Sequence, residues 1–200
     1  EDTPFAPVCK KGEYRVHATE RLLAAHRAGN VRVAIGRASD FFGPATPLAH
    51  FGERFYQRVL AGKPGECIGD PDMPHTYSYS PDVARGLVTL GLDERGDGKT
   101  WMLPVQPAES ARAVTNRMGK ALGREIRVTR VPKLAMRLLG VFSSQMAELV
   151  EMTYQWEQPF VVDDSRFRAT FGGLPTDWDA AIAATIGWAA PTYARAAKAA

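Results

Sequence analysis

The sequence predicts an α/β fold built on a parallel sheet, and three observations carry that prediction. Segments with helical periodicity alternate with short runs of β-branched residues over residues 1–130, which is the pattern of βαβ units. The 200 residues include 45% hydrophobic and 24% charged side chains, close to the averages of globular domains. The net charge is only +3, whereas nucleic-acid binders usually carry a dense basic face. We therefore expect a folded protein that does not bind nucleic acid.

The first elements form half of a βαβ unit. Residues 15–29 predict a helix that Gly29 ends, and the β-branched run at 31–39 predicts a strand. A polar loop with Gly43 follows directly. Because ligands gather at the carboxyl ends of parallel strands, we expect chemistry in the loop at 38–44.

The remaining elements follow from the same signals, with Gly or Pro at the breaks. We expect helices at 50–61, 81–92, 110–123, through most of 132–157, and at 176–191. We expect strands at 65–69, 75–80, 100–105 and 124–131. The tryptophans, which we expect to pack in a core or between domains, are Trp101, Trp156, Trp178 and Trp188.

Metal, membrane and secretory signals are missing from the sequence. Cys9 and Cys67 form no CxxC motif, and the four histidines are scattered, so we expect no metal. Two thiols in a reducing compartment are the expectation, with one disulfide formally open. No apolar run approaches the roughly 18 residues that span a bilayer, and the first residues do not resemble a signal peptide. We therefore expect a soluble, cytoplasmic protein with no membrane partner.

Several segments, in chain order, resemble the NAD-dependent epimerase/dehydratase family of extended and atypical short-chain dehydrogenase/reductases. RVAIGRASDFFGP at 32–44 resembles the family's R-x-x-N/D-x-Y/F-G-P segment, and HTYSYSPDVARGLVTLG at 75–91 resembles its Y-V-x-D-V-A segment. Residues 101–123 are similar to the last sheet strand and the helix after it, and residues 131–188 to the C-terminal part.

This resemblance implies the C-terminal part of a Rossmann-type parallel sheet with a smaller α+β substrate lobe, and NAD or NADP as cofactor. It assigns residues 1–48 to the end of the dinucleotide-binding domain and 49–80 to the substrate lobe. It assigns 81–105 to a helix and strand returning to the Rossmann sheet, and 106–200 to the C-terminal lobe.

The family's glycine-rich loop, ribose selector and catalytic Ser or Thr are not found in these residues. We therefore expect several βα units to precede them in a longer protein. The strand at 31–36 would then present an apolar edge that favours association with the missing N-terminal part or with a second copy.

The family's catalytic pair, a Tyr followed four residues later by a Lys, is absent. Glu20 fits the family's Glu, which puts the Lys position at Val16 and the Tyr position at Gly12. A phenol with a pKa of about 10 needs such a cation to act as a base near neutral pH. Tyr14 and Lys11 remain as weak replacements, and the competing interpretation is that they are solvated residues at a helix start.

The resemblance also suggests binding residues. Ala38 and Ser39 match positions whose backbone borders the nicotinamide. Asp40 matches an Asn that touches substrate, and it either binds a hydroxyl or caps the loop. His75 replaces an Arg that binds diphosphate in nucleotide-sugar epimerases, which counts against a UDP-sugar substrate; it either faces the substrate pocket or is a bystander. Tyr77 lies on a strand in which alternate residues face the cleft.

The leading interpretation is the C-terminal part of an NAD(P)-dependent epimerase/dehydratase-like oxidoreductase that acts on a small alcohol, carbonyl or sugar-like substrate. The 200 residues alone are expected to be inactive. The alternative is a dinucleotide-binding regulatory or scaffold protein with a degenerate, non-catalytic fold. The two interpretations differ in whether the longer protein catalyses hydride transfer.

Overall fold

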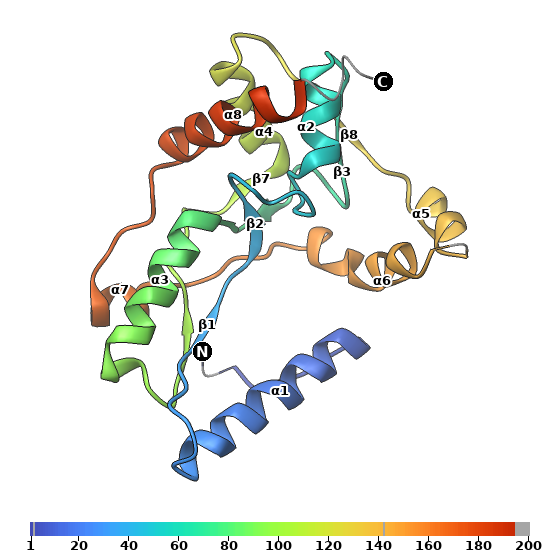
Figure 1. Ribbon diagram of the computed structural model, residues 1–200. Helices are drawn as coiled ribbons and strands as arrows, with labels where there is room; N and C mark the ends of the chain where they lie inside the picture. The colour runs from blue at the N-terminus through green and yellow to red at the C-terminus, as the bar shows by residue number, and fades with distance from the viewer. Residues whose placement is uncertain (2, 142, 195–200) are drawn as a thin grey trace. The chain divides into compact units, whose positions relative to one another are not determined.

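The computed structural model describes residues 1, 3–141 and 143–194 (Figure 1). Its helices, of which η1 and η2 are 3₁₀ helices, are α1 (Lys10–Arg27), α2 (Glu53–Leu60), α3 (Ser80–Leu92), η1 (Glu94–Gly96), α4 (Ala111–Ala121), α5 (Lys133–Gly140), α6 (Ser144–Met152), η2 (Thr153–Trp156), α7 (Ser165–Phe171) and α8 (Trp178–Ala194). Its strands are β1 (Ile35–Arg37), β2 (Asp40–Phe42), β3 (Gly65–Cys67), β4 (Pro74–His75), β5 (Tyr77–Tyr79), β6 (Thr100–Met102), β7 (Glu109–Ser110) and β8 (Val128–Arg130).

The strands pair two by two, and most pairs are parallel. β1 pairs with β6, β2 with β5 and β3 with β8 in parallel, while β4 and β7 pair antiparallel. The parallel partners lie far apart in the sequence with helices between them, as parallel crossovers require. The predicted α/β class is confirmed, although the described strands form separate pairs and not one continuous sheet.

Several predicted strands are shorter in the structure. The strand predicted at 31–39 forms only at Ile35–Arg37, because the Val33 carbonyl accepts a hydrogen bond from Gly98 N (2.7 Å) outside the ladder. The strand predicted at 124–131 begins only at Val128, because Arg124 N donates back to Gly119 O and closes the end of α4.

Two predicted helices also differ from those observed. The stretch 132–157 is broken into α5, α6 and η2. At the break, a Cβ on Gly140 would lie 3.3 Å from the backbone of Ala147, so the glycine allows α5 and α6 to approach closely. The helix predicted at 15–29 begins at Lys10 and ends at Arg27, which places Tyr14 and Lys11 within a helix and not in a loop before it.

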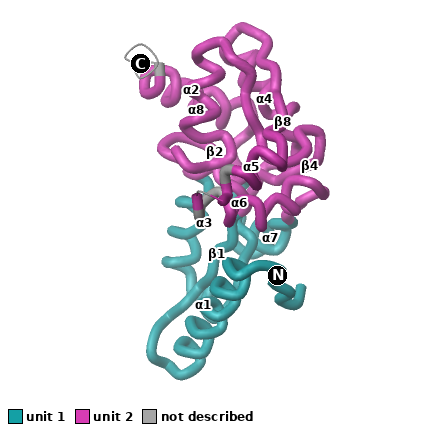
Figure 2. The backbone as a smooth tube through the Cα atoms, turned by 90° about the vertical axis from the view of Figure 1, so that its right-hand side faces the viewer, with its two compact units in different colours: residues 1–38, 82–104, 163–174 teal, residues 39–81, 105–162, 175–200 magenta. Residues whose placement is uncertain are grey.

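The chain divides into two compact units (Figure 2). Unit 1 comprises residues 1–38, 82–104 and 163–174, and unit 2 comprises residues 39–81, 105–162 and 175–200.

Unit 1 has a small core beside the β1–β6 pair. Its buried cluster is Val83, Leu90, Trp101, Leu103 and Phe167. The Trp101 indole donates to Gly96 O (3.1 Å), and its ring meets Phe171 edge-on with centroids 4.8 Å apart. This aromatic contact fixes α7 against β6.

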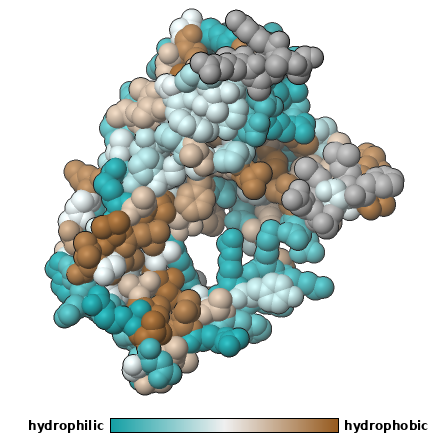
Figure 3. All heavy atoms as spheres, viewed as in Figure 1, coloured by the Kyte–Doolittle hydropathy of each residue, from teal (hydrophilic) through white to brown (hydrophobic). Residues whose placement is uncertain are grey.

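Much apolar surface of unit 1 is exposed. On α3, Leu87, Val88 and Leu92 are 49%, 60% and 82% exposed, and apolar atoms gather over this helix in Figure 3. β1 pairs with β6 along one edge, and no strand of the described residues pairs with its other edge. In folded proteins, unpaired strand edges and large apolar patches are usually covered by other parts of the chain or by a partner.

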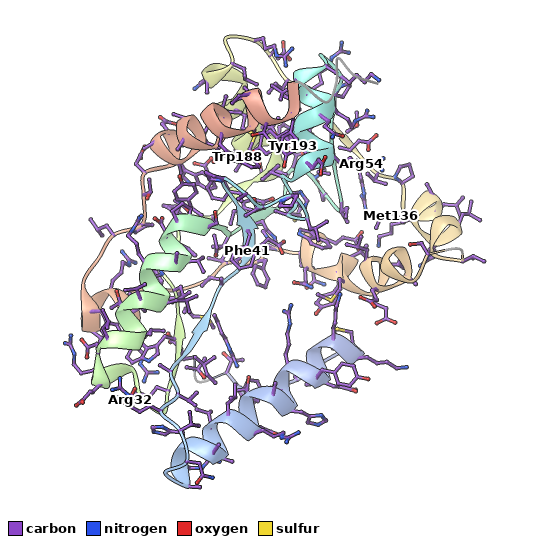
Figure 4. All side chains as sticks on the ribbon, in the orientation of Figure 1. Arg32, Phe41, Arg54, Met136, Trp188 and Tyr193 are labelled. Carbon is purple, nitrogen blue, oxygen red and sulfur yellow. The ribbon has the colours of Figure 1, made fainter. Side chains whose placement is uncertain are left out.

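Unit 2 has a larger, aromatic core between α2, α4 and α8. Its buried cluster is Phe42, Phe51, Phe55, Tyr56, Val59, Cys67, Tyr77, Tyr79, Ala111, Val114, Met118, Ile126, Trp178, Ala181, Ile182, Ile186, Ala189 and Tyr193. Trp178 stacks on Phe42 with centroids 5.1 Å apart. On α8, Trp188 and Tyr193 lie together, 5.4 Å apart (Figure 4), and Tyr193 stacks on Tyr56 of α2. This packing holds β2 and β5 in place.

Candidate functional site

A polar cluster lies in unit 2 where β2 and β5 begin. Asp40 is the first residue of β2, and the parallel register places it beside Tyr77, the first residue of β5. His75 ends β4, two residues before Tyr77. The exposed Phe41, labelled in Figure 4, marks the position of β2 next to Asp40. The fold thus brings together the three residues that the sequence suggested for substrate binding.

The Asp40 carboxylate has two close neighbours. His75 Nε2 lies 3.0 Å from Asp40 Oδ2, although the ring is not aligned for a straight hydrogen bond. The Trp156 indole donates Nε1–H to the same oxygen at 2.6 Å. His75 is almost fully buried, whereas 30% of the Asp40 side chain remains exposed. One end of the cluster is therefore accessible and the other is enclosed.

Trp156 is held in this position by a glycine. A Cβ on Gly69 would lie 2.3 Å from Trp156 Cβ, and Gly69 has a φ of 78°, in the left-handed region that favours glycine. Asp70 N donates to Trp156 O at 2.8 Å. Both constraints set the indole beside Asp40.

Aromatic rings surround the imidazoles. His75 packs against Tyr77, with centroids 4.8 Å apart, and stacks on Phe160 at 5.0 Å. His50, from the loop before α2, lies 5.8 Å from both Tyr77 and Trp156. The cluster therefore contains two imidazoles, one carboxylate and an apolar wall.

Burial and charge set the protonation states. Burial alone would raise the pKa of Asp40, but the contact with His75 and the Trp156 N–H hold it below its usual value, so Asp40 is ionised. Burial lowers the pKa of His50 to about 4, against the opposing charge of Asp40, so His50 is neutral near pH 7. Burial, with the Asp40 charge, raises the pKa of Tyr77. Tyr77 therefore keeps its proton and does not act as a base.

Buried nitrogens in the cluster lack partners. His75 Nδ1 and His50 Nε2 are enclosed and have no hydrogen-bond partner. Both residues line a cavity with about 190 Å³ of empty space, too finely divided for a water-sized sphere. Each unpartnered buried polar atom costs about 1–3 kcal/mol, so such atoms are rare in folded proteins.

The two residues suggested for cofactor binding differ in their surroundings. Ala38, in unit 1, is exposed. Ser39, in unit 2, is buried; its N–H donates to Ser78 Oγ (2.9 Å) and its hydroxyl donates to Thr76 O. Their role at a nicotinamide stays a prediction.

Tyr14 and Lys11 lie on adjacent turns of α1, three residues apart, and both are exposed. This spacing places them on one helix face, with the Lys before the Tyr and not four residues after it. They belong to unit 1, whereas Asp40, His75 and Tyr77 belong to unit 2. Their catalytic role stays a prediction.

The sequence analysis did not predict that His50 belongs to this cluster. It expected Trp156 only to pack in a core or between domains, and did not predict its hydrogen bond to Asp40. Neither lies in a recognisable motif, since His50 follows a Pro-rich loop and Trp156 is 116 positions from Asp40. Cys67 is not a reactive thiol, because burial raises its pKa to about 11 and keeps it protonated.

Two features are absent from the part of the chain that the structure describes. There, no group of three or more His, Cys, Asp or Glu side chains is placed to hold a metal ion. No described helix combines the length and apolarity that crossing a bilayer requires.

The fold is that of the C-terminal part of Rossmann-like epimerases and dehydratases, as comparison with solved structures shows. The chain is similar to UDP-glucuronic acid 4-epimerase from Bacillus cereus in complex with NAD, with a TM-score of 0.73 and 18% identity over 97% of this chain and 55% of that one. It is also similar to a dTDP-glucose 4,6-dehydratase from Streptomyces venezuelae with NAD bound, with a TM-score of 0.72 and 16% identity over 98% of this chain and 55% of that one.

A third similar structure is UDP-N-acetylglucosamine 4-epimerase from Methanobrevibacter ruminantium, with a TM-score of 0.71 and 14% identity over 96% of this chain and 57% of that one. The chain therefore spans little more than half the length of these structures. No protein-family model matches the sequence, and comparison with curated proteins finds no relative.

Proposed function

We propose that these residues form the C-terminal, substrate-binding part of an NAD(P)-dependent epimerase/dehydratase-like oxidoreductase. Its substrate would be a small molecule with an alcohol or carbonyl group. The observation that carries the proposal is the convergence of Asp40, His75 and Tyr77 in one partly buried cluster of a chain with this fold.

In this proposal each residue has a chemical task. The ionised Asp40 carboxylate accepts a hydrogen bond from a substrate hydroxyl and so orients the molecule. His75, almost fully buried against Phe160, is a positioning residue that holds the carboxylate. Tyr77 keeps its proton and forms one wall of the site.

These residues would supply only part of a cofactor-binding site. NAD, present in the similar structures, would supply hydride transfer when bound. Ala38 and Ser39 are the proposed neighbours of its nicotinamide, through the small side chain and the backbone. The sequence contains no Gly-x-Gly-x-x-Gly motif, the usual cradle for the pyrophosphate. The 200 residues alone therefore do not fit a complete dinucleotide.

The rest of the fold would come from βα units that precede these residues. In the proposed protein they cover the open edge of β1 and the apolar face of α3, which carries Leu87, Val88 and Leu92. A second copy of the chain is the alternative cover. Size-exclusion chromatography of the 200-residue chain, with and without the upstream segment, separates the two.

A regulatory or scaffold role is the second candidate, and one observation favours it. The Tyr-x-x-x-Lys pair is absent, and Tyr14 and Lys11 on α1 do not reproduce its spacing. Such a protein would bind a dinucleotide without turnover.

The test uses the coding sequence extended upstream in frame. We expect calorimetry to detect NAD(H) or NADP(H) binding by the extended protein and none tighter than millimolar by the 200-residue chain. Tight binding by the short chain would contradict the proposal. Binding without hydride transfer, across a panel of alcohols and carbonyls, would support the regulatory role.

A further inference from the structure

Resting on the proposed function, in which Asp40 binds a substrate hydroxyl, we propose that Trp156 is a positioning residue for that carboxylate. Its indole N–H fixes one oxygen, Oδ2, so that the other oxygen, Oδ1, faces the substrate. The surroundings of the two oxygens, and the way in which Trp156 is held, support this role.

The oxygen Oδ2 of Asp40 is held from two sides. The Trp156 indole Nε1–H donates to it at 2.6 Å, and His75 Nε2 lies 3.0 Å away. An N–H bonded to an ionised carboxylate forms a short, strong hydrogen bond. An Asp carboxylate without such a contact takes a broad range of angles about its terminal torsion. The indole therefore limits the orientation of the whole carboxylate.

The oxygen Oδ1 of Asp40 is left accessible. In the described part of the chain no group donates a hydrogen bond to Oδ1, and Oδ1 is not among the enclosed polar atoms that lack a partner. Since 30% of the Asp40 side chain is exposed, Oδ1 is open to solvent. An ionised carboxylate only accepts hydrogen bonds, so a substrate hydroxyl can donate to Oδ1 without displacing Trp156.

The backbone around Trp156 is anchored. A Cβ on Gly69 would lie 2.3 Å from Trp156 Cβ, so the backbone of residue 69 lies directly against this side chain. Asp70 N donates to Trp156 O at 2.8 Å. The next residue, Glu157, forms ion pairs of 2.7 and 2.5 Å with two basic side chains. These contacts place the indole independently of Asp40, as a positioning group requires.

The hydrogen bond of Trp156 differs from those of two other tryptophans. The Trp101 and Trp178 indoles donate to backbone carbonyls at 3.1 Å, and both rings belong to the buried core clusters. Within the described residues, Trp156 belongs to neither cluster and is only partly buried. Its N–H bonds instead to the ionised side chain of the candidate site. Core packing therefore does not account for the position of this indole.

The first test measures the hydrogen bond in the 200-residue chain and needs no ligand. Trp156→Phe keeps a ring but removes the N–H. We expect the pKa of Asp40, followed through its carboxyl ¹³C signal, to rise, because the lost donor stabilised the charged form. Trp188→Phe is the matched control, since Trp188 is also a partly buried tryptophan of unit 2. It is expected to leave the pKa of Asp40 unchanged.

A second reading of the same bond needs no change at Trp156. At pH 7, Asp40→Asn is expected to move the Trp156 Nε1–H signal to lower ¹H frequency, because the charged acceptor is lost. Glu53→Gln changes an exposed carboxylate on α2 that is bonded to Gln57, and is expected to leave that signal in place. If the pKa of Asp40 did not respond to Trp156→Phe, or the indole signal did not respond to Asp40→Asn, the inference would be overturned.

Kinetics then ask whether the bond serves binding, in the extended protein and with an alcohol that the panel identifies as its substrate. Trp156→Phe is expected to raise KM about tenfold with kcat nearly unchanged, because Oδ1 contacts substrate and transition state alike. Trp188→Phe is expected to change neither constant. If Trp156 acts through Asp40, adding Trp156→Phe to Asp40→Asn lowers kcat/KM no further. An unchanged KM, or losses that simply add, would overturn the positioning role.

Failure of this inference differs from failure of the proposed function. An extended protein that oxidises an alcohol with the same KM in both tryptophan variants would sustain the proposed function and overturn the inference. An extended protein that binds a dinucleotide but turns over no alcohol or carbonyl would overturn the proposed function, and with it the role given to Trp156, even where NMR finds the bond to Asp40.

Discussion

Unit 2 and unit 1 solve the problem of burying apolar surface differently. Among the described residues, the core cluster of unit 2 contains eighteen buried residues, while that of unit 1 contains five. Unit 2 uses aromatic stacking among α2, α4, α8 and the strands, whereas unit 1 leaves Leu87, Val88 and Leu92 of α3 exposed. Unit 2 therefore has the internal packing of a complete lobe, and unit 1 has the surface of a part that requires a cover.

This difference bears on where the proposed binding cluster lies. Holding unpartnered imidazole nitrogens in a closed cavity requires rigid surroundings. Unit 2 supplies these through Phe42, Trp178 and the rings around His75. The cluster of Asp40, His75 and Tyr77 consequently lies within unit 2 alone.

The largest expected effect compares one buried tryptophan from each unit. Trp178→Ala removes a ring stacked on Phe42 and is expected to lower the free energy of unfolding by about 3–5 kcal/mol. Trp101→Ala is expected to cost less, because the partly exposed Phe171 and Arg166 beside it collapse into the space. Chemical denaturation measures both, with Leu48→Ala, at a 99% exposed site, as control. The reverse order would contradict the comparison of the two cores.

The pH dependence of stability reports on the enclosed site of unit 2. Burial lowers the pKa of folded His50 to about 4, whereas an unfolded histidine takes up its proton near pH 6.5. Between these values the unfolded state binds more protons, so stability is fully present above pH 6.5 and falls by roughly 3 kcal/mol as the pH drops to 4. Asp40, whose pKa is also lowered, contributes below this window.

His50→Gln is expected to remove most of this slope, and His17→Gln, an exposed histidine on α1, to leave it unchanged. Denaturation series between pH 7 and pH 4 measure it. If His50→Gln retained the slope of the original protein, the enclosure of His50 in unit 2 would be wrong.

A smaller effect tests how Trp156 is held. Gly69→Ala adds a Cβ that would lie 2.3 Å from Trp156 Cβ at a φ of 78°, and is expected to cost about 3 kcal/mol from clash and backbone strain together. Gly123→Ala shares the positive φ (66°) but has no atom within 4 Å of the new Cβ. It is expected to cost about 1–2 kcal/mol. Thermal unfolding compares the two variants. Equal losses of stability would show that Gly69 does not hold the Trp156 indole in place.

The smallest expected effect on stability belongs to the exposed face of unit 1. Replacing Leu87, Val88 and Leu92 together by Gln is expected to change the free energy of unfolding by less than about 0.5 kcal/mol per site, since the side chains are exposed. Self-association of the 200-residue chain, followed by light scattering against concentration, is expected to decrease. A large loss of stability would mean that α3 is already covered and that unit 1 is not the open part.

The sequence was sufficient for the kinds and order of most elements. The Pro81–Asp82 start of α3, the Ser110 cap of α4, whose hydroxyl accepts from Ala113 N, and the alternation of helices with strands are local signals. Strand lengths were overestimated, because each strand ends where a hydrogen-bond partner is missing, and the partner lies elsewhere in the chain. Val33 and Arg124 illustrate this, since their backbone groups bond to turns and not to a ladder.

By itself, the sequence determined the α/β class, because the alternation of helices and strands is a local pattern. The family resemblance, and not residue type or spacing, suggested Asp40, His75 and Tyr77 as binding residues. Only the tertiary structure decided that these residues meet, that Trp156 closes over Asp40, and that His50 joins them. Contacts between residues more than a hundred positions apart depend on how the whole core packs. No local pattern encodes such packing, because each pair meets only after every other element of unit 2 is in place.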